Sequence, residues 1–429
     1  MVTKDIQTII DSYPDYLAEV QKNYWRNFIL LCFDSSFFTF STSLLSQDTI
    51  LPYFLDALTS NPVLIGLIPA LFYLGYLLPQ IISSFITVNT AKRKKIILVI
   101  AIAERIGILF IAITSSLISR VSINLVLTLF FLSYMVYTTT MGLIMPAYSD
   151  FISKAIYKGR GMYYGVTQAI GGLIGFAASY VSTILLSRYD FPLNYQYLFW
   201  LSFLTSFVSP ILIANFREVE LPVKIVKQSF SAFVKGIPAL INSRPGVKNY
   251  IFARQLIGLA IIGNSFFSVY AINHFNQASS VLGYYTMAIL LAQCLSGVVW
   301  GMVGDRFGYK KVLIAASLIP LLNSALALLS TQTWPFILIS SLIGVYYSAI
   351  YIGHPNIIFE ISPPEQTSQF IGISNTLIAP VAVVAPIIGG KIVEVSGYRT
   401  LFILMLIFSL IATLFTIFKV VEPRKMGED

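Results

Sequence analysis

The sequence predicts an all-α membrane protein with twelve transmembrane helices, arranged as two six-helix bundles related by pseudo-symmetry. Three observations predict this fold class: the composition, the recurrence of long apolar stretches and a set of landmarks shared by the two halves of the chain. Hydrophobic residues make up 56% of the 429 residues, and charged residues make up only 11%. One soluble core cannot bury so many apolar side chains, whereas a lipid bilayer can surround them.

Mainly apolar stretches recur along the whole chain. Roughly 20 such residues are needed to cross about 30 Å of hydrocarbon at about 1.5 Å per residue. We predict twelve spans: Asn27–Pro52, Val63–Val88, Ile96–Ile118, Ile123–Pro146, Met162–Leu186, Tyr195–Phe216, Val247–Ile272, Val281–Val303, Val312–Leu329, Pro335–Phe359, Phe370–Ile392 and Leu401–Val420. An even number of spans places both termini on the same side.

The two halves of the chain share landmarks at an offset of about 210 residues. The matching pairs are the 92–95 basic loop with the 305–311 loop, Pro146 with Pro355, Gly165 and Gln168 with Gly372 and Asn375, and Tyr197 and Phe199 with Tyr398 and Phe402. They occur in the same order in both halves. An internal repeat of this kind is how many membrane carriers build a central site between two bundles.

Lysine and arginine concentrate in the loops on one side of the spans. Of the 28 residues, 22 fall on the side of both termini and four on the opposite side, which leaves Arg105 and Arg254 inside spans. Cytoplasmic loops retain positive charge, so we expect a multi-pass plasma-membrane protein with both termini cytoplasmic. The predicted organisation is a cytoplasmic segment at 1–26, a bundle at 27–216, an amphipathic cytoplasmic linker at 217–246, a second bundle at 247–420 and a cytoplasmic tail at 421–429.

Several function classes are excluded by the sequence. The net charge of +9 is spread over every loop on the basic side, so we expect no nucleic-acid partner. A phosphate-binding loop, a metal-ligand cluster and a nucleophile triad are all missing from the sequence, so we expect neither an enzyme nor an ATP-driven pump. We therefore expect no cofactor, with the proton considered as a coupling ion. The expected partners are a small-molecule substrate and membrane lipids, and we expect a monomer.

A charged segment separates two apolar stretches of the second half. Its patterned residues are Gly301, Gly304, Asp305, Arg306, Gly308, Lys310 and Lys311. The segment resembles the motif A loop, GxxxDRxGRK, of the major facilitator superfamily, whose members move small solutes through two six-helix halves. The resemblance implies a latch that holds the cytoplasmic gate in one state as the halves rock. A short charged turn without a coupling role is the alternative.

Other superfamily patterns are incomplete in this chain. In the first-half copy of motif A, Asn89 or Thr90 stands where aspartate is expected, and Thr138 occupies the arginine position of drug-proton antiporters. Span five carries several glycines without the antiporter proline, and the sugar-porter loop signature is missing. The resemblance is therefore to the superfamily, with the subfamily left open. It also implies that spans one, four, seven and ten line the cavity.

Ionisable groups inside spans are candidate pathway residues because a charge in hydrocarbon costs several kcal/mol unless it faces protein or water. In span one, Asp34, Ser41 and Asp48 are seven residues apart and should share a helix face. Asp34 would carry a proton or contact substrate, or else pair with an arginine or hydroxyl of another helix. Asp48 is expected to satisfy the outer end of a helix.

Spans seven and ten hold the remaining candidates. Arg254 would attract an anionic substrate, pair with Asp34, or extend to the cytoplasmic interface. Asn264 can bond to substrate or across helices. In span ten, Tyr347, Tyr351 and His354 share a stripe, and Pro355 should break the helix beside the histidine. His354 would couple proton movement to opening or be satisfied structurally.

The function that we predict is secondary active transport of a small amphipathic organic solute by alternating access, as proton-coupled efflux. Within transport, the alternative is a uniporter or importer of a polar metabolite. From another class, the alternative is a membrane scaffold that keeps the fold without moving solute.

Overall fold

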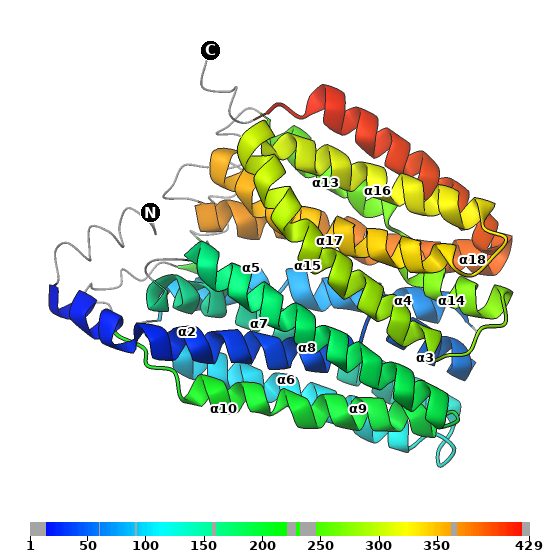
Figure 1. Ribbon diagram of the computed structural model, residues 1–429, viewed down its shortest axis with the longest axis horizontal. Helices are drawn as coiled ribbons and strands as arrows, with labels where there is room; N and C mark the ends of the chain where they lie inside the picture. The colour runs from blue at the N-terminus through cyan, green and yellow to red at the C-terminus, as the bar shows by residue number, and fades with distance from the viewer. Residues whose placement is uncertain are drawn as a thin grey trace.

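The computed structural model describes residues 14–59, 61–90, 92–156, 160–220, 229–231, 246–361 and 367–422. In these ranges every regular element is an α-helix, which confirms the all-helical prediction (Figure 1). The helices are α2 (Pro14–Ser43), α3 (Ile50–Thr59), α4 (Pro62–Leu77), α5 (Gln80–Val88), α6 (Arg93–Ser116), α7 (Ile123–Ala155), α8 (Arg160–Arg188), α9 (Leu193–Ser206), α10 (Val208–Ala214), α13 (Val247–Ala260), α14 (Asn264–His274), α15 (Val281–Phe307), α16 (Tyr309–Leu329), α17 (Pro335–Ile361) and α18 (Thr367–Lys419).

Ten helical stretches of the described chain are long and apolar enough to cross a membrane, so the protein is a multi-pass integral membrane protein. The longest, Ile373–Lys419, is interrupted at Gly397, whose φ of 80° and ψ of 170° are not helical. The α2 helix is absent from the ten because its apolar part ends early, at Ser43. The predicted linker at 217–246 and tail at 421–429 lie largely outside the described residues, as do residues 1–13.

Four predicted spans are divided in the structure. Span one is divided into α2 and α3, span two into α4 and α5, span six into α9 and α10, and span seven into α13 and α14. The expected break at Pro355 does not occur, because α17 continues through it to Ile361. Because α2 ends at Ser43, Asp48 lies in the break after this helix. It does not continue the helix face that holds Asp34 and Ser41, contrary to the prediction.

We call α2 to α10 the first half and α13 to α18 the second half. Within the first half, α6 packs on α7 and α2 packs on α8; within the second, α15 packs on α17, and α16 on α17 and α18. Across the halves, α4 packs on α18 and α15 packs on α8. The α4–α18 contact is very close, since a Cβ on Gly66 would lie 2.3 Å from the carbonyl oxygen of Pro386, and one on Gly390 would lie 2.3 Å from that of Pro62.

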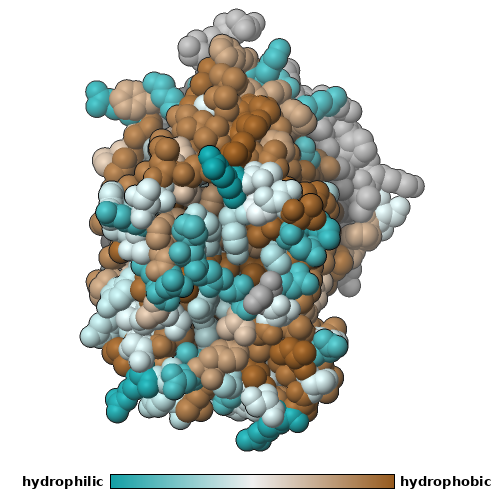
Figure 2. All heavy atoms as spheres, turned by 90° about the vertical axis from the view of Figure 1, so that its right-hand side faces the viewer, coloured by the Kyte–Doolittle hydropathy of each residue, from teal (hydrophilic) through white to brown (hydrophobic). Residues whose placement is uncertain are grey.

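The helices run roughly parallel to one long direction, and their ends define two faces of the molecule (Figure 1). We call the face with the start of α2, the start of α16 and the end of α18 the basic end, and the opposite face the distal end. Figure 2 looks onto the distal end, where hydrophilic side chains gather across the middle between hydrophobic flanks. Many large hydrophobic side chains are exposed on the helices, as expected for surfaces that contact lipid.

Candidate functional site

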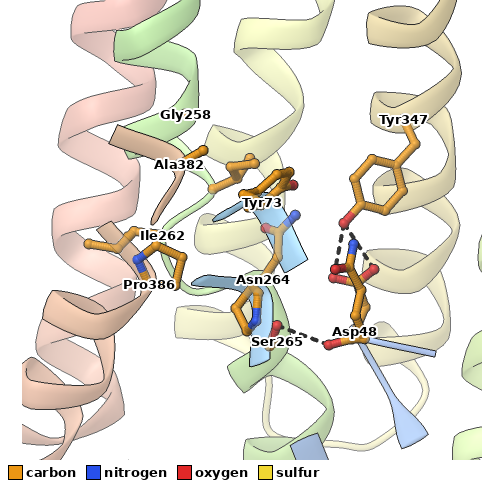
Figure 3. Close-up of a pocket in the computed structure, with 12 residues that line it drawn as sticks. Asp48, Tyr73, Gly258, Ile262, Asn264, Ser265, Tyr347, Ala382 and Pro386 are labelled. Atoms are coloured by element: carbon orange, nitrogen blue, oxygen red, sulfur yellow. Dashed lines mark hydrogen bonds between the residues drawn. The ribbon is translucent and has the colours of Figure 1, made fainter. Parts of the chain in front are cut away.

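The two halves meet inside the bundle through the break in span one, opposite the middle of α17. The hydroxyl of Tyr347 on α17 donates to both carboxylate oxygens of Asp48, at 2.9 Å each (Figure 3). The backbone carbonyl of Asp48 accepts a hydrogen bond of 2.8 Å from Ser268 on α14. Thr49 and Thr286 share a hydroxyl hydrogen bond of 2.6 Å. Asp48 and Thr49 are buried, so these bonds join the halves away from solvent.

A small cavity lies beside this contact, between the breaks of spans one and seven. Its volume is about 20 Å³, which is room for about one water molecule. Asp48 and Tyr347 lie on one side of it, and Asn264 and Tyr73 on the other (Figure 3). The amide oxygens of Asn264 and Gln47 are buried without a hydrogen-bond partner. A water molecule could donate to both oxygens, whereas an organic solute is too large for this space.

A chain of polar side chains extends from α13 to the first half. The Tyr250 hydroxyl bonds to Nδ1 of His354, and Nε2 of His354 lies 3.0 Å from the amide oxygen of Asn375. The amide nitrogen of Asn375 donates to Gln80 on α5 at 3.4 Å. An amide oxygen can only accept, so Nε2 carries a proton and donates to Asn375. His354 therefore links helices with both of its nitrogens occupied.

Arg254 lies near this chain, inside the protein. Its side chain is buried, with a residue exposure of 9%, and its Nε has no hydrogen-bond partner. The hydroxyls of Tyr250 and Tyr346 lie close to the guanidinium group. The expected alternatives of an ion pair with Asp34 and of extension to the interface are both wrong, because the partners of Asp34 lie elsewhere and Arg254 points into the helix packing.

Asp34 belongs to a separate buried cluster in the first half. Its Oδ2 accepts a hydrogen bond of 2.6 Å from the Tyr148 hydroxyl on α7. Its Oδ1 has no partner of standard geometry, although the Ser209 hydroxyl approaches it. Glu104 and Arg105 pair with each other at 2.5 Å, and Nε of Arg105 donates to the backbone carbonyl of Ser206 on α9 at 3.0 Å.

The segment that resembles motif A is mostly helical. Helix α15 continues to Phe307 and so includes Gly301, Gly304, Asp305 and Arg306, and the chain turns only at Gly308, which has a φ of 89°. A positive φ favours glycine, so this residue ends the helix. The expectation of a loop at these positions is therefore wrong.

The described contacts of the motif A segment lie within the second half. The Tyr309 hydroxyl donates to Asp305 at 2.8 Å, and Nζ of Lys310 donates to the carbonyl of Ile417 at 2.8 Å. Glu422, which follows α18, accepts from the backbone N–H of Lys310 at 3.3 Å. The partly exposed Lys311 lies 4.7 Å from the ring centroid of Phe307.

The first half repeats this arrangement at the start of α6. Glu218, which follows α10, accepts from the backbone N–H groups of Arg93 at 2.7 Å and Lys94 at 3.0 Å. Nζ of Lys94 donates to the carbonyls of Ala214 and Phe216. In each half, therefore, a carboxylate that follows the last span accepts hydrogen bonds from backbone N–H groups at the start of the third span. These N–H groups have no partner within their own helix.

The structure brings some predicted residues together and separates others. Asn264 and Tyr347 line one cavity, whereas Ser41 lies between α2 and α9, bonded to Ser202 at 2.8 Å. Tyr351 is 56% exposed and lies between the halves, near Tyr76 and Tyr164.

Sequence reasoning assigned Asp48 to a helix end and did not find its contact with Tyr347. The acidic residue stands close to Pro52 in the sequence, and this proximity was the only available signal of a break.

Comparisons with known proteins agree with this architecture. The family model of the Major Facilitator Superfamily matches residues 255–429. The multi-drug resistance efflux pump PmrA of Streptococcus pneumoniae is 27% identical over 185 residues, which is 41% of this chain and 45% of the pump. The MFS-type transporter VdtG of Byssochlamys spectabilis is 28% identical over 130 residues, which is 30% of this chain and 23% of that protein. The matched regions thus span less than half the length of these relatives.

Solved structures share the fold over most of the chain. The D-xylose-proton symporter has a TM-score of 0.69 at 15% identity, and the comparison covers 94% of this chain and 99% of the symporter. The nucleoside transporter NupG has a TM-score of 0.66 at 15% identity and covers 91% and 97%. At this identity the likeness concerns the fold alone. The family model and the solved structures thus make the second half of the chain similar to the Major Facilitator Superfamily and the fold of the whole chain similar to that of transporters.

Proposed function

We propose that the protein is a secondary transporter that moves a small amphipathic organic solute across the membrane by alternating access. The observation that carries this proposal is the contact between Asp48 and Tyr347, which joins the two halves inside the bundle, one helical turn to the distal side of Tyr351. Toward the basic end, Tyr351 is exposed between the halves. A molecule closed at one end and accessible nearer the other corresponds to one of the two states that alternating access requires.

The membrane topology that we propose has twelve spans in two six-helix bundles. Eleven spans follow if the stretch that contains Gly397 is counted as two, and α2 supplies the twelfth. The repeated roles of Glu218 and Glu422 support a relation between the bundles. The basic end then faces the cytoplasm with both termini, and the described state opens inward. We place the chain in the plasma membrane as a monomer.

We further propose efflux coupled to proton entry, with Asp34 as the proton carrier. The carboxylates of Asp34 and Glu104 are buried together with Arg105, and Arg105 forms an ion pair with Glu104. Asp34 is left with a tyrosine hydroxyl and one unpaired oxygen, so binding a proton would remove its uncompensated charge. The direction is supported by the similarity to PmrA, which is named as an efflux pump.

Transport by the full-length chain in liposomes tests these proposals. The probes are 1-naphthoate, 1-naphthamide and 1-naphthylmethylamine, which share an aromatic body and differ in charge. Movement of at least one probe should accelerate when a proton gradient is imposed, and protons should move with it, as reported by a pH-sensitive dye in the lumen. Wild-type flux that a proton gradient does not accelerate and that moves no protons distinguishes a uniporter.

The variant Asp34→Asn should keep counterflow but lose the acceleration by the proton gradient, because an amide cannot exchange a proton. Glu394→Gln is the matched control, since Glu394 is an exposed carboxylate paired with Lys391. Gradient-driven flux that is the same in Asp34→Asn and wild type would contradict the role of Asp34. No flux of any probe under any gradient would contradict transport and leave the scaffold alternative.

A further inference from the structure

We infer that the transported solute carries a negatively charged oxyanion group and that Arg254 binds it. This inference rests on the proposed transport function and adds the substrate class. It starts from the buried charges of the protein, because a charge removed from water needs a partner of opposite sign.

The described residues include three buried arginines: Arg93, Arg105 and Arg254. Arg93 pairs with Asp150 at 2.6 Å, and Arg105 pairs with Glu104 at 2.5 Å. Arg254 forms no ion pair with any described carboxylate, and its buried Nε makes no hydrogen bond. In a protein that compensates its other buried arginines with carboxylates, a guanidinium group without a described carboxylate indicates an anionic partner that arrives from outside.

The surroundings of Arg254 are neutral and aromatic. The hydroxyls of Tyr250 and Tyr346 lie close to the guanidinium group, and Tyr73 of the first half lies near it as well. His354 bonds to Tyr250 and Asn375 and carries no negative charge in either of its protonation states. Aromatic faces suit the apolar body of an amphipathic solute, and a guanidinium binds an oxyanion with two parallel hydrogen bonds.

The position of Arg254 suits a solute that enters from the basic end. It lies seven residues after Val247, the first residue of α13, which is about 10 Å along the helix. The cavity at the distal contact is too small for a solute, whereas Tyr351, on the same helix as Tyr346, is exposed between the halves. The contact between Asp48 and Tyr347 then forms the distal limit of the site.

Equilibrium binding to the purified full-length chain tests the inference. The probes are 1-naphthoate, 1-naphthalenesulfonate, 1-naphthamide and 1-naphthylmethylamine, titrated calorimetrically in detergent. At least one of the two anions should bind at least tenfold more tightly than the amide and the amine, and the tighter anion identifies the oxyanion. Arg254→Met should weaken the binding of that anion by tenfold or more and leave the binding of the amide unchanged. Arg254→Lys should have an intermediate effect on the binding of the anion.

Thermal stability without ligand gives a second readout that a purely structural arginine would not produce. Removing an uncompensated buried charge should leave the melting temperature of Arg254→Met equal to or above that of the wild type. Arg188→Gln is the control, because it removes an exposed arginine from the end of α8 and should change neither measurement. A lower melting temperature in Arg254→Met would indicate a structural role and overturn the inference.

The inference is also overturned if neither anion binds better than the amide, or if Arg254→Met keeps the preference for the anion. Its failure can be distinguished from failure of the transport proposal. Binding of an anion that depends on Arg254, without flux in liposomes, would support an oxyanion site at Arg254 and remove transport. Flux of only the neutral or cationic probe would support transport and overturn the inference.

Discussion

The contact between Asp48 and Tyr347 provides the sharpest test of the two-state mechanism. In Tyr347→Phe the carboxylate would lose the hydroxyl that donates to both of its oxygens and would stay buried in the closed distal end. A hydrogen bond to a charged group contributes about 1.5–3 kcal/mol. In the open state water replaces the hydroxyl, so this loss falls on the closed state alone. The ratio of closed to open molecules should therefore decrease by about 10-fold to about 150-fold.

Distances between spin labels at the distal end measure this ratio. Labels at Arg188 and Gln332, which are exposed on the first and second halves, can be introduced after both native cysteines have been replaced. Tyr347→Phe should add a population with a longer distance. Tyr285→Phe is the control, because it removes a buried hydroxyl that donates to Gln277 within the second half at 2.8 Å. An unchanged distribution in Tyr347→Phe, or the same change in the control, would refute the reasoning.

Two further predictions concern stability, measured as the melting temperature in detergent. Arg105→Gln leaves the Glu104 carboxylate buried without its ion pair and should destabilise the protein by about 3–5 kcal/mol. Lys391→Gln breaks an exposed ion pair and should destabilise the protein by no more than about 1 kcal/mol, so equal effects of the two variants would contradict the role of burial. Gly66→Ala places a methyl group 2.3 Å from a backbone oxygen of α18 and should destabilise the protein by about 1–3 kcal/mol. Gly165→Ala should not destabilise the protein, because a methyl group there has no neighbouring atom within 4 Å. A Gly66→Ala variant as stable as the wild type would show that the contact between α4 and α18 is loose.

Hydropathy was sufficient to predict the helical class and most helix positions. For example, the predicted span 312–329 lies within α16, Tyr309–Leu329. Prediction works for these elements because a bilayer requires every backbone polar group to be satisfied within the helix, so apolar length alone identifies them. The break after Ser43 was not predicted, because the apolar stretch was counted through the four polar residues from Ser46 to Thr49.

The site residues were less predictable than the helices. The sequence singled out Asp34, Arg254 and His354 as costly groups inside spans, since the cost of burying a charge depends on residue type and depth. It could not say that Asp34 meets Tyr148, or that Arg254 has no carboxylate beside it. Such pairings depend on which helix faces meet, and residues far apart in the chain decide them.

By itself, the sequence determined that this protein is built of membrane-spanning helices with charged residues inside the spans. Only the tertiary structure decided which of those charges are compensated and where the halves touch. The physical reason is that hydrophobic transfer into lipid acts on each segment separately, whereas hydrogen bonds and ion pairs require atoms of different segments to lie within a few ångströms of one another.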